Sequence, residues 1–281
     1  MKAVRMQPGY GVQEAGSPGE FEVAFLAPDG TEQRLPLEQA TRYPFESVIP
    51  VRSFPSFRGQ RNNTGWWWTA TTGSHVGFES WLERDLLIGF DFDPTVTAIS
   101  SQPFWLLWHE DGRVRRHAPD FFLRHACGTG SVIDCRPADR IEPRDAAAFA
   151  TTARACSQMG WRFEVLHAPD PVRTANLRWL SGYKHPRCRR DDLARTAVDL
   201  TVEPLSVLEL AAALGDPVGT LPTVFHLLWH GELETNLSVP LSENSLVALR
   251  VAESSTARDV RGRGQAATGR NNDGGAHPTA G

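Results

Sequence analysis

Long apolar runs are missing from this sequence. The densest apolar stretch lies at residues 104–108, far short of the roughly 20 residues that a membrane-spanning helix needs. Residues 1–16 also lack the apolar segment of a secretory signal. These absences exclude a helical membrane protein and lead us to expect a cytoplasmic one.

Paired cysteines are missing as well. The four cysteines, Cys127, Cys135, Cys156 and Cys188, show no C-x-x-C spacing, which argues against a zinc knuckle or a dithiol redox motif. An unpatterned set in a chain of 281 residues is typical of reduced thiols in a cytoplasm.

Lysine is scarce, because Lys2 and Lys184 are the only lysines among 29 cationic residues, while the net charge is −4. We favour a GC-rich coding bias as the explanation, with phosphate binding by guanidinium groups as the functional alternative. One set of basic residues has two equally good interpretations, an ordinary charged surface or a binding site for a phosphate backbone. The set is Arg52, Arg58, Arg61, Arg113, Arg115, Arg116 and His117.

The first two thirds of the chain show the pattern of an α/β protein. Two strand-like runs around residues 28–30 predict a hairpin within an N-terminal extension, residues 1–49. An irregular arm over residues 50–73 is expected to lead into the main domain, residues 50–185. Periodicity there predicts helices from Gly77 to Phe90 and over 143–159 and 172–183, and strands at 96–99, 103–108, 120–123, 131–135 and 162–167. This order of elements predicts an α/β sandwich.

A smaller helical domain is predicted over residues 192–251. Ser206 and Glu209 have the spacing of a capping box, which opens a helix. A second helix is expected to begin at Thr220, and strands at 233–240 and 245–251 complete a winged helix-turn-helix pattern. Because this second helix has no Arg or Lys, we expect the domain to bind protein rather than DNA. Residues 252–281 have almost no large apolar side chain, which predicts a disordered tail.

Two carboxylates are predicted to meet at neighbouring strands. Asp120 precedes one apolar strand and Asp134 ends the next, so the two lie about one strand spacing apart, roughly 4.8 Å. Oxygen ligands of this kind favour Mg²⁺ or Mn²⁺. Arg136 is two residues beyond Asp134 and is expected to face the same way. The structural alternative is that Asp120 caps a turn and that Asp134 and Arg136 mark a solvated strand end.

Glu79 and Glu83 are four residues apart, and both are placed on the helix predicted to start at Gly77. Either one is a candidate for a third carboxylate, as metal-assisted phosphodiester hydrolysis requires. Cys135, between Asp134 and Arg136, is expected to point into the core. Its backbone carbonyl is a candidate additional metal ligand.

At these residues the chain resembles the PD-(D/E)xK nuclease superfamily, and within it the TnsA-type endonuclease subunits of heteromeric transposases. Residues 119–120 and 134–136 match the two halves of the motif, and Ser80-Trp81-Leu82-Glu83 is similar to the family's Ser-x-Leu-Glu helix. Residues 90–96 and Gln102-Pro103-Phe104 continue the likeness, which covers roughly residues 50–185. It implies a restriction-endonuclease-like α/β/α sandwich with a mixed sheet.

The resemblance implies roles for individual residues. Glu83 matches the helix carboxylate, Glu79 becomes an alternative to it, Asp120 matches the central metal ligand, and Asp134 takes the second strand position. Arg136 stands where a lysine is usual. Since arginine stays protonated at working pH, it cannot act as a base, although it can stabilise negative charge on a phosphate.

The resemblance also implies a function. Members of the family cut one strand of double-stranded DNA at each transposon end, with an integrase-type transposase and an AAA+ ATPase regulator as partners. Two alternatives remain open at this stage: a catalytically weak or silent assembly module of nuclease fold, and a stand-alone restriction or repair nuclease.

Overall fold

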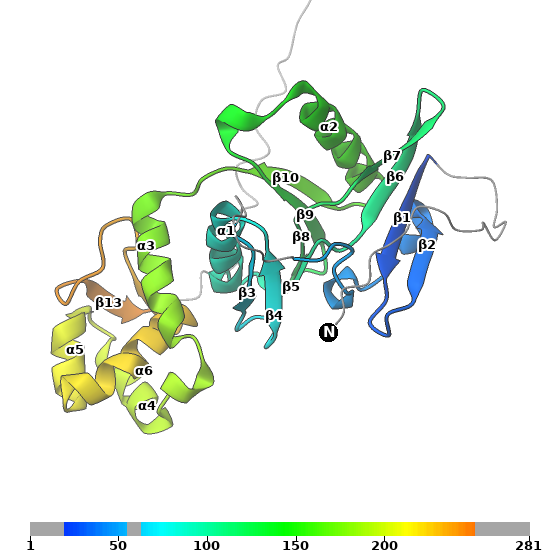
Figure 1. The fold of residues 1–281 in the computed structure, drawn as a ribbon. Helices are drawn as coiled ribbons and strands as arrows, with labels where there is room; N and C mark the ends of the chain where they lie inside the picture. Colours follow the sequence, from blue (N-terminus) through cyan, green and yellow to red (C-terminus); the bar gives the residue numbers. More distant parts are fainter. Residues whose placement is uncertain (1–19, 55–62, 251–281) are drawn as a thin grey trace, which may run out of the picture. The chain divides into compact units, whose positions relative to one another are not determined.

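The computed structural model describes residues 20–54 and 63–250 (Figure 1). By its internal contacts the chain divides into two units, Met1–Leu249 and Arg250–Gly281, and all the elements below belong to the first. In the described part of the chain, no helix is long and apolar enough to cross a membrane. Arg58 and Arg61 of the basic set, the first 19 residues of the N-terminal extension and the predicted tail lie outside the described residues.

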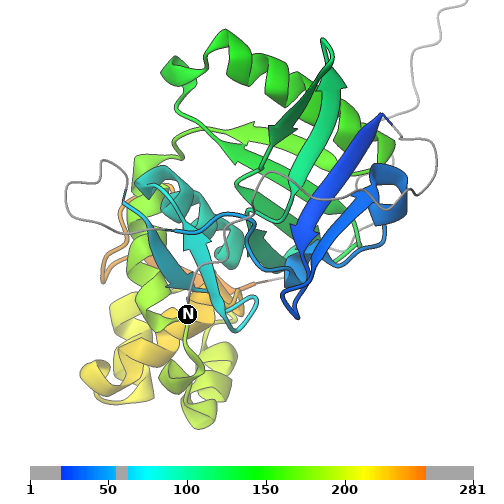
Figure 2. The same cartoon turned by 45° about the vertical axis from the view of Figure 1, so that its right-hand side comes forward.

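The first sheet is antiparallel, with strand order β2-β1-β6-β7. Its strands are β1 (Phe21–Leu26), β2 (Glu32–Pro36), β6 (Trp105–Glu110) and β7 (Arg113–His117). The predicted N-terminal hairpin is confirmed as β1 and β2, drawn in blue beside β6 and β7 in Figure 2. The turn between β6 and β7 places Asp111 at φ 50° and Gly112 at φ 70°, the conformation that suits a two-residue hairpin.

The second sheet is mixed, with strand order β10-β9-β8-β5. Its strands are β5 (Val96–Ser101), β8 (Phe121–His125), β9 (Gly130–Cys135) and β10 (Arg162–Leu166). The pairs β5–β8 and β8–β9 are antiparallel, whereas β9 and β10 run parallel. Parallel neighbours need a crossover, and helix α2 (Pro143–Gln158) provides it. This arrangement confirms a mixed α/β architecture with a mixed sheet.

Helices cover both faces of the mixed sheet. Phe122 and Val132 pack in one cluster with Cys156 of α2, while Phe121 and Ile133 pack in another with residues of α1 (Trp81–Phe92). Side chains alternate between faces along a strand, so α1 and α2 lie on opposite sides of β8 and β9 (Figure 1).

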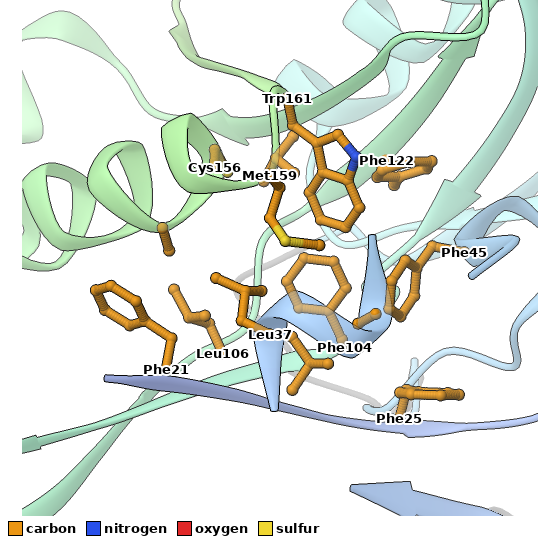
Figure 3. Packing of buried hydrophobic residues seen from close by; sticks show 14 of the residues in the cluster. Phe21, Phe25, Leu37, Phe45, Phe104, Leu106, Phe122, Cys156, Met159 and Trp161 are labelled. Atoms are coloured by element: carbon orange, nitrogen blue, oxygen red, sulfur yellow. The ribbon is translucent and has the colours of Figure 1, made fainter. Parts of the chain in front are cut away.

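The α2 face joins the two sheets through an aromatic core. Phe45, Phe104, Phe122 and Trp161 surround one another, with Phe45 within 6.0 Å of each of the other three ring centroids (Figure 3). Each ring meets its neighbours edge-on or tilted, an arrangement that favours aromatic contacts beyond simple burial. Short 3-10 helices connect these parts: η1 (Leu37–Ala40), η2 (Phe45–Ser47) and η3 (Ala138–Arg140).

A two-stranded sheet replaces part of the predicted irregular arm and the start of the predicted helix. Strands β3 (Gly65–Trp68) and β4 (His75–Phe78) pair antiparallel. The prediction that a helix begins at Gly77 is therefore wrong. Helix α1 begins at Trp81, with Ser80 as its N-cap.

The C-terminal part is mainly helical. Its elements are α3 (Pro171–Leu180), η4 (Ser181–Tyr183), η5 (Pro186–Cys188), α4 (Asp191–Leu200), α5 (Val207–Leu214) and α6 (Pro217–Trp229), with a sheet of order β11-β13-β12 from Leu205–Ser206, Leu246–Leu249 and Leu233–Thr235. The capping box of Ser206 and Glu209 is confirmed. Thr220 does not cap α6, because Asp216 accepts from the Gly219 N–H and Pro217 stands at the first position.

The environment of His226 makes the C-terminal part sensitive to acid. His226 is 4% exposed, and its Nδ1 lies 2.9 Å from the Tyr183 carbonyl oxygen. Burial lowers the pKa of His226 from 6.5, and the neighbouring His230 lowers it further. A lowered pKa means that the stability it contributes is present above pH 6.5 and is lost as pH falls through the folded-state value.

We therefore expect acidification below pH 6.5 to reduce the free energy of unfolding, and His226→Gln to weaken this dependence. Urea denaturation at a series of pH values measures the effect. His75→Gln, at an exposed position of β4 outside the C-terminal part, is the control. If the free energy of unfolding changed equally with pH in wild type and in His226→Gln, His226 would not contribute to the acid sensitivity.

Candidate active site

Asp120 lies immediately before β8 and is held in place by three hydrogen bonds. Its N–H donates to the Ile133 carbonyl at 3.0 Å, and its own carbonyl accepts from the Gln102 N–H at 2.9 Å. The carboxylate Oδ2 accepts from the Cys135 N–H at 2.7 Å, and the side chain is buried. The predicted neighbourhood of strands 120–123 and 131–135 is therefore confirmed, with the Asp120 carboxylate held over the end of β9.

Asp134 lies in β9 and is 0% exposed. Its Oδ2 is 2.8 Å from His117 Nε2, while its Oδ1 has no hydrogen-bond partner within the described part of the chain. His117 ends β7, and its ring packs at 6.0 Å from Phe149 of α2. The first sheet thus supplies a partner for a carboxylate of the second sheet.

Glu83 is buried in the first turn of α1. Its Oε1 accepts from the Ser80 hydroxyl at 2.8 Å, its Oε2 accepts from the Glu79 N–H at 2.6 Å, and its own N–H donates to Ser80 Oγ at 3.2 Å. This reciprocal bonding is close to that of a capping box. Ser80 and Glu83 therefore start the helix, whatever else the glutamate does.

Glu79 does not share a helix face with Glu83, contrary to the sequence-based expectation. It precedes the N-cap of α1 and forms an ion pair with Arg52. Its backbone N–H, rather than its carboxylate, contacts Glu83. We therefore drop the interpretation that the two glutamates project from one helix.

Three carboxylates, those of Asp120, Asp134 and Glu83, act on one another electrostatically. Burial raises the pKa of Asp120 well above its usual value, and the negative charges of Asp134 and Glu83 raise it further. Burial also raises the pKa of Glu83. The Cys135 thiol has a pKa well above its usual value because of burial and the charges of Asp120, Glu83 and Asp134. Cys135 is buried and packs in the same cluster as Phe121 and Ile133, which confirms the expectation that its side chain points into the core.

Arg136 adds a positive charge at the same place. Its Nη1 lies 3.8 Å from Asp120 Oδ2 and donates to the Cys135 carbonyl at 3.0 Å. The Arg136 side chain is 37% exposed, whereas Asp120 is buried. Its positive charge partly opposes the rise that burial causes in the pKa values of Asp120 and Glu83. It thereby favours their charged forms.

The segment that contains these strands matches a known protein family. Residues 93–167, which include Asp120, Asp134 and Arg136, match the family described as TnsA-like endonuclease N terminal. This segment is a TnsA-like endonuclease domain of the PD-(D/E)xK type. No curated protein matches the chain. The TnsA-like domain points to a nuclease linked to transposition and to DNA binding in that process.

A divalent metal is usual in this family, and the donor set of the TnsA-like domain can be tested for it. Over residues 20–54 and 63–250, no group of three His, Cys, Asp or Glu side chains is placed to hold a metal ion. However, Mg²⁺ typically takes only one or two protein carboxylates, with water and phosphate completing its shell. Asp120 and Asp134 offer two carboxylates of the kind that Mg²⁺ takes, and among the residues that the structure describes Asp134 Oδ1 has no hydrogen-bond partner.

Sequence reasoning missed the contact between His117 and Asp134. In the sequence His117 belongs to a basic stretch, but in the structure its Nε2 contacts Asp134, 17 positions further along the chain. The pattern His117-Ala118-Pro119-Asp120 places the histidine close to the motif, but only the packing of the two sheets identifies its partner.

Proposed function

We propose that this protein is a divalent-metal-dependent DNA endonuclease subunit of a heteromeric transposase, which hydrolyses a phosphodiester on one strand at each transposon end. The observation that carries the proposal is that the buried Asp120 carboxylate and the buried Cys135 thiol both experience the negative charges of Asp134 and Glu83. Arg136 lies beside Asp120, with its Nη1 3.8 Å from Oδ2. This arrangement supports the activity that the TnsA-like domain suggests.

In this proposal Asp120 and Asp134 hold Mg²⁺ or Mn²⁺, and Glu83 adds negative charge from α1. The Cys135 carbonyl is a candidate fourth oxygen donor, although it already accepts from Arg136. The metal supplies polarisation of the phosphate and of a water molecule. Arg136 donates to a non-bridging phosphate oxygen and stabilises the charge that develops when water attacks phosphorus and the P–O bond breaks. Because a guanidinium cannot take the proton of that water, the proton would pass to solvent, and the departing oxygen would take up a proton from solvent in turn.

The fold is consistent with the same proposal, and we propose the following domain boundaries with it. A mixed sheet covered by α1 and α2 is consistent with a restriction-endonuclease-like α/β/α sandwich over residues 50–185, after an extension at 1–49. We interpret α4, α5, α6 and the sheet β11-β13-β12 as a winged helix-turn-helix within residues 192–251. The proposed domain organisation is thus an N-terminal extension, a nuclease domain, a winged helix-turn-helix domain and a tail at residues 252–281.

The C-terminal part is proposed to bind a protein partner. Helix α6 (Pro217–Trp229) contains no Arg or Lys, and most of its second half is buried. A helix that reads base edges needs polar or cationic side chains. The partners expected for the whole protein are an AAA+ ATPase regulator, an integrase-type transposase and double-stranded transposon ends.

A second candidate function is an assembly module with weak or silent catalysis. Specific contacts favour it: Asp134 is engaged by His117, Glu83 is engaged by its own helix cap, and an arginine stands at position 136. In that case the nuclease fold serves to organise DNA and partner subunits.

The direct test is strand cleavage by the full chain with Mg²⁺ or Mn²⁺ on DNA carrying transposon ends, with and without the two partner subunits. The proposal predicts cleavage of one strand per end, dependent on the partners and lost in EDTA. Metal-dependent cleavage of the same DNA without partners would favour a stand-alone nuclease. Assembly without any cleavage would favour the silent module.

Arg136 variants separate weak from absent catalysis. We expect Arg136→Lys to retain or increase the cleavage rate, because a lysine provides a cation that can also exchange a proton. Arg136→Gln should lower the rate about 10²-fold, the usual effect of losing one donor to a developing oxyanion. Single-turnover rates measure both. Equal rates for wild type and Arg136→Gln would remove Arg136 from the mechanism.

A further inference from the structure

Gln102 combines three unusual features next to Asp120. Its side chain is 1% exposed, and neither Oε1 nor Nε2 has a hydrogen-bond partner in the described part of the chain. Its backbone also adopts φ 44°, although it is not a glycine. An apolar residue would fill the same buried position without an unpaired amide, so packing alone does not explain a glutamine there.

The backbone conformation of Gln102 is costly for its sequence context. Positive φ is uncommon outside glycine, and the residue before a proline normally prefers extended backbone at negative φ. Pro103 follows directly. Strain of this kind persists where the surroundings enforce it, and it concentrates at functional sites.

The position of Gln102 relates it to the proposed active site. Its N–H donates to the Asp120 carbonyl at 2.9 Å, and its carbonyl accepts from the Val51 N–H at 2.9 Å. The register Ser101↔Phe121 and Phe121↔Ile133 places Gln102 level with Asp120 and Asp134 across the sheet. Val51 is adjacent to Arg52, the partner of Glu79. The backbone of Gln102 is thus held between those of Asp120 and Val51.

We infer that Gln102 is a positioning residue whose carboxamide holds a buried water molecule beside Asp120, the water that attacks the phosphodiester. The inference rests on the proposed function. A buried water usually makes about three hydrogen bonds, and the carboxamide offers both a donor and an acceptor. Asp134 Oδ1, at the same level of the sheet, is a further acceptor that has no partner among the described residues. With its protons held by acceptors, the water keeps a lone pair for phosphorus.

Three substitutions at this position separate the carboxamide from the backbone and from volume. Gln102→Met keeps the size and removes the amide. Gln102→Gly and Gln102→Asn both suit positive φ, but only asparagine keeps an amide. Ser100→Ala is the control, because Ser100 is buried on the same strand and its hydroxyl is satisfied by the Phe45 carbonyl at 2.7 Å.

The expected result is a rate loss without a stability loss. Gln102→Met should lower the single-turnover cleavage rate about 10²-fold while the melting temperature in EDTA stays the same or rises. Gln102→Asn should retain more of the rate than Gln102→Gly. Ser100→Ala should instead lower the melting temperature and leave the rate near that of wild type.

A rate for Gln102→Met within threefold of wild type would overturn the inference, as would Gln102→Gly and Gln102→Asn losing equal activity. A crystal structure of the chain in EDTA gives a readout that does not depend on catalysis. It should show ordered water bonded to the carboxamide, whereas a carboxamide bonded to protein groups alone would also overturn the inference. Absence of wild-type cleavage would count against the proposed function and leave the bound-water result to decide on Gln102.

Discussion

Asp120→Asn is expected to abolish strand cleavage, with a loss of at least about 10³-fold in the single-turnover rate. Asparagine keeps the shape and an oxygen that can accept from the Cys135 N–H, which the carboxylate does at 2.7 Å. It removes the negative charge that lies 3.8 Å from Arg136 and that is repelled by the charges of Asp134 and Glu83. The change therefore tests the charge of the central carboxylate and leaves the strand geometry intact.

Folding of this variant should not suffer. Burial and two negative neighbours already raise the pKa of Asp120 well above its usual value, so a neutral side chain suits the metal-free protein. The melting temperature in EDTA should be unchanged or higher. Asp139→Asn is the matched control, since Asp139 is an exposed aspartate close to the same strand end. Normal cleavage by folded Asp120→Asn would refute the assignment of Asp120 as the central ligand.

Asp91→Asn is expected to cost about 3–5 kcal/mol of the free energy of unfolding. Lys184 Nζ lies 2.9 Å from Asp91 Oδ2, and the two side chains are 7% and 0% exposed. Burial lowers the pKa of Lys184, which the charge of Asp91 opposes. Asparagine still accepts from Thr71, whose N–H and hydroxyl both donate to Asp91 Oδ1 at 2.9 Å. The loss therefore reports a buried ammonium group without its counter-ion.

Aromatic rings around Lys184 do not replace the carboxylate. Its Nζ lies 4.3 Å from the Trp67 ring centroid, 5.5 Å from that of Trp229 and 5.6 Å from that of Trp68. Such cation–π contacts contribute about 0.5–2 kcal/mol each, less than the desolvation of a buried charge. The double variant Asp91→Asn with Lys184→Met should recover part of the loss, because replacing both charges removes the uncompensated one.

An exposed ion pair on the same helix provides the control. Arg178 Nε donates to Asp85 Oδ1 at 2.9 Å, and the arginine side chain is 48% exposed. Arg178→Met should cost only about 0–1 kcal/mol. Urea denaturation of the four proteins measures all these effects. A cost below about 1 kcal/mol for Asp91→Asn would place the Lys184–Asp91 pair in the same class as the exposed one.

Local signals in the sequence predicted the parts of the fold that depend on neighbouring residues. The capping box at Ser206, the hairpin of β1 and β2, and the adjacent strands that begin near Asp120 and end at Cys135 are all confirmed. Their patterns extend over only a few residues, and alternating or capped sequences specify them directly.

Elements that depend on tertiary packing were not predictable in this way. Three consecutive tryptophans hide the alternation of β3, in which Trp67 packs against the core and Trp66 is 55% exposed. Gly77 belongs to β4, where a Cβ atom would lie 2.5 Å from the Phe54 ring, so the glycine permits close approach rather than a helix. The pairing of His117 with Asp134 requires the two sheets to meet, which no local pattern encodes.

The central claim is that Asp120 and Asp134 bind one divalent ion with Glu83 close by. Anomalous diffraction from a crystal of the full chain soaked in Mn²⁺ tests it most directly. The account predicts one peak about 2.1 Å from a carboxylate oxygen of Asp120 and one of Asp134, absent in Asp120→Asn. A peak at other residues, or none while His117 stays bonded to Asp134, would contradict it.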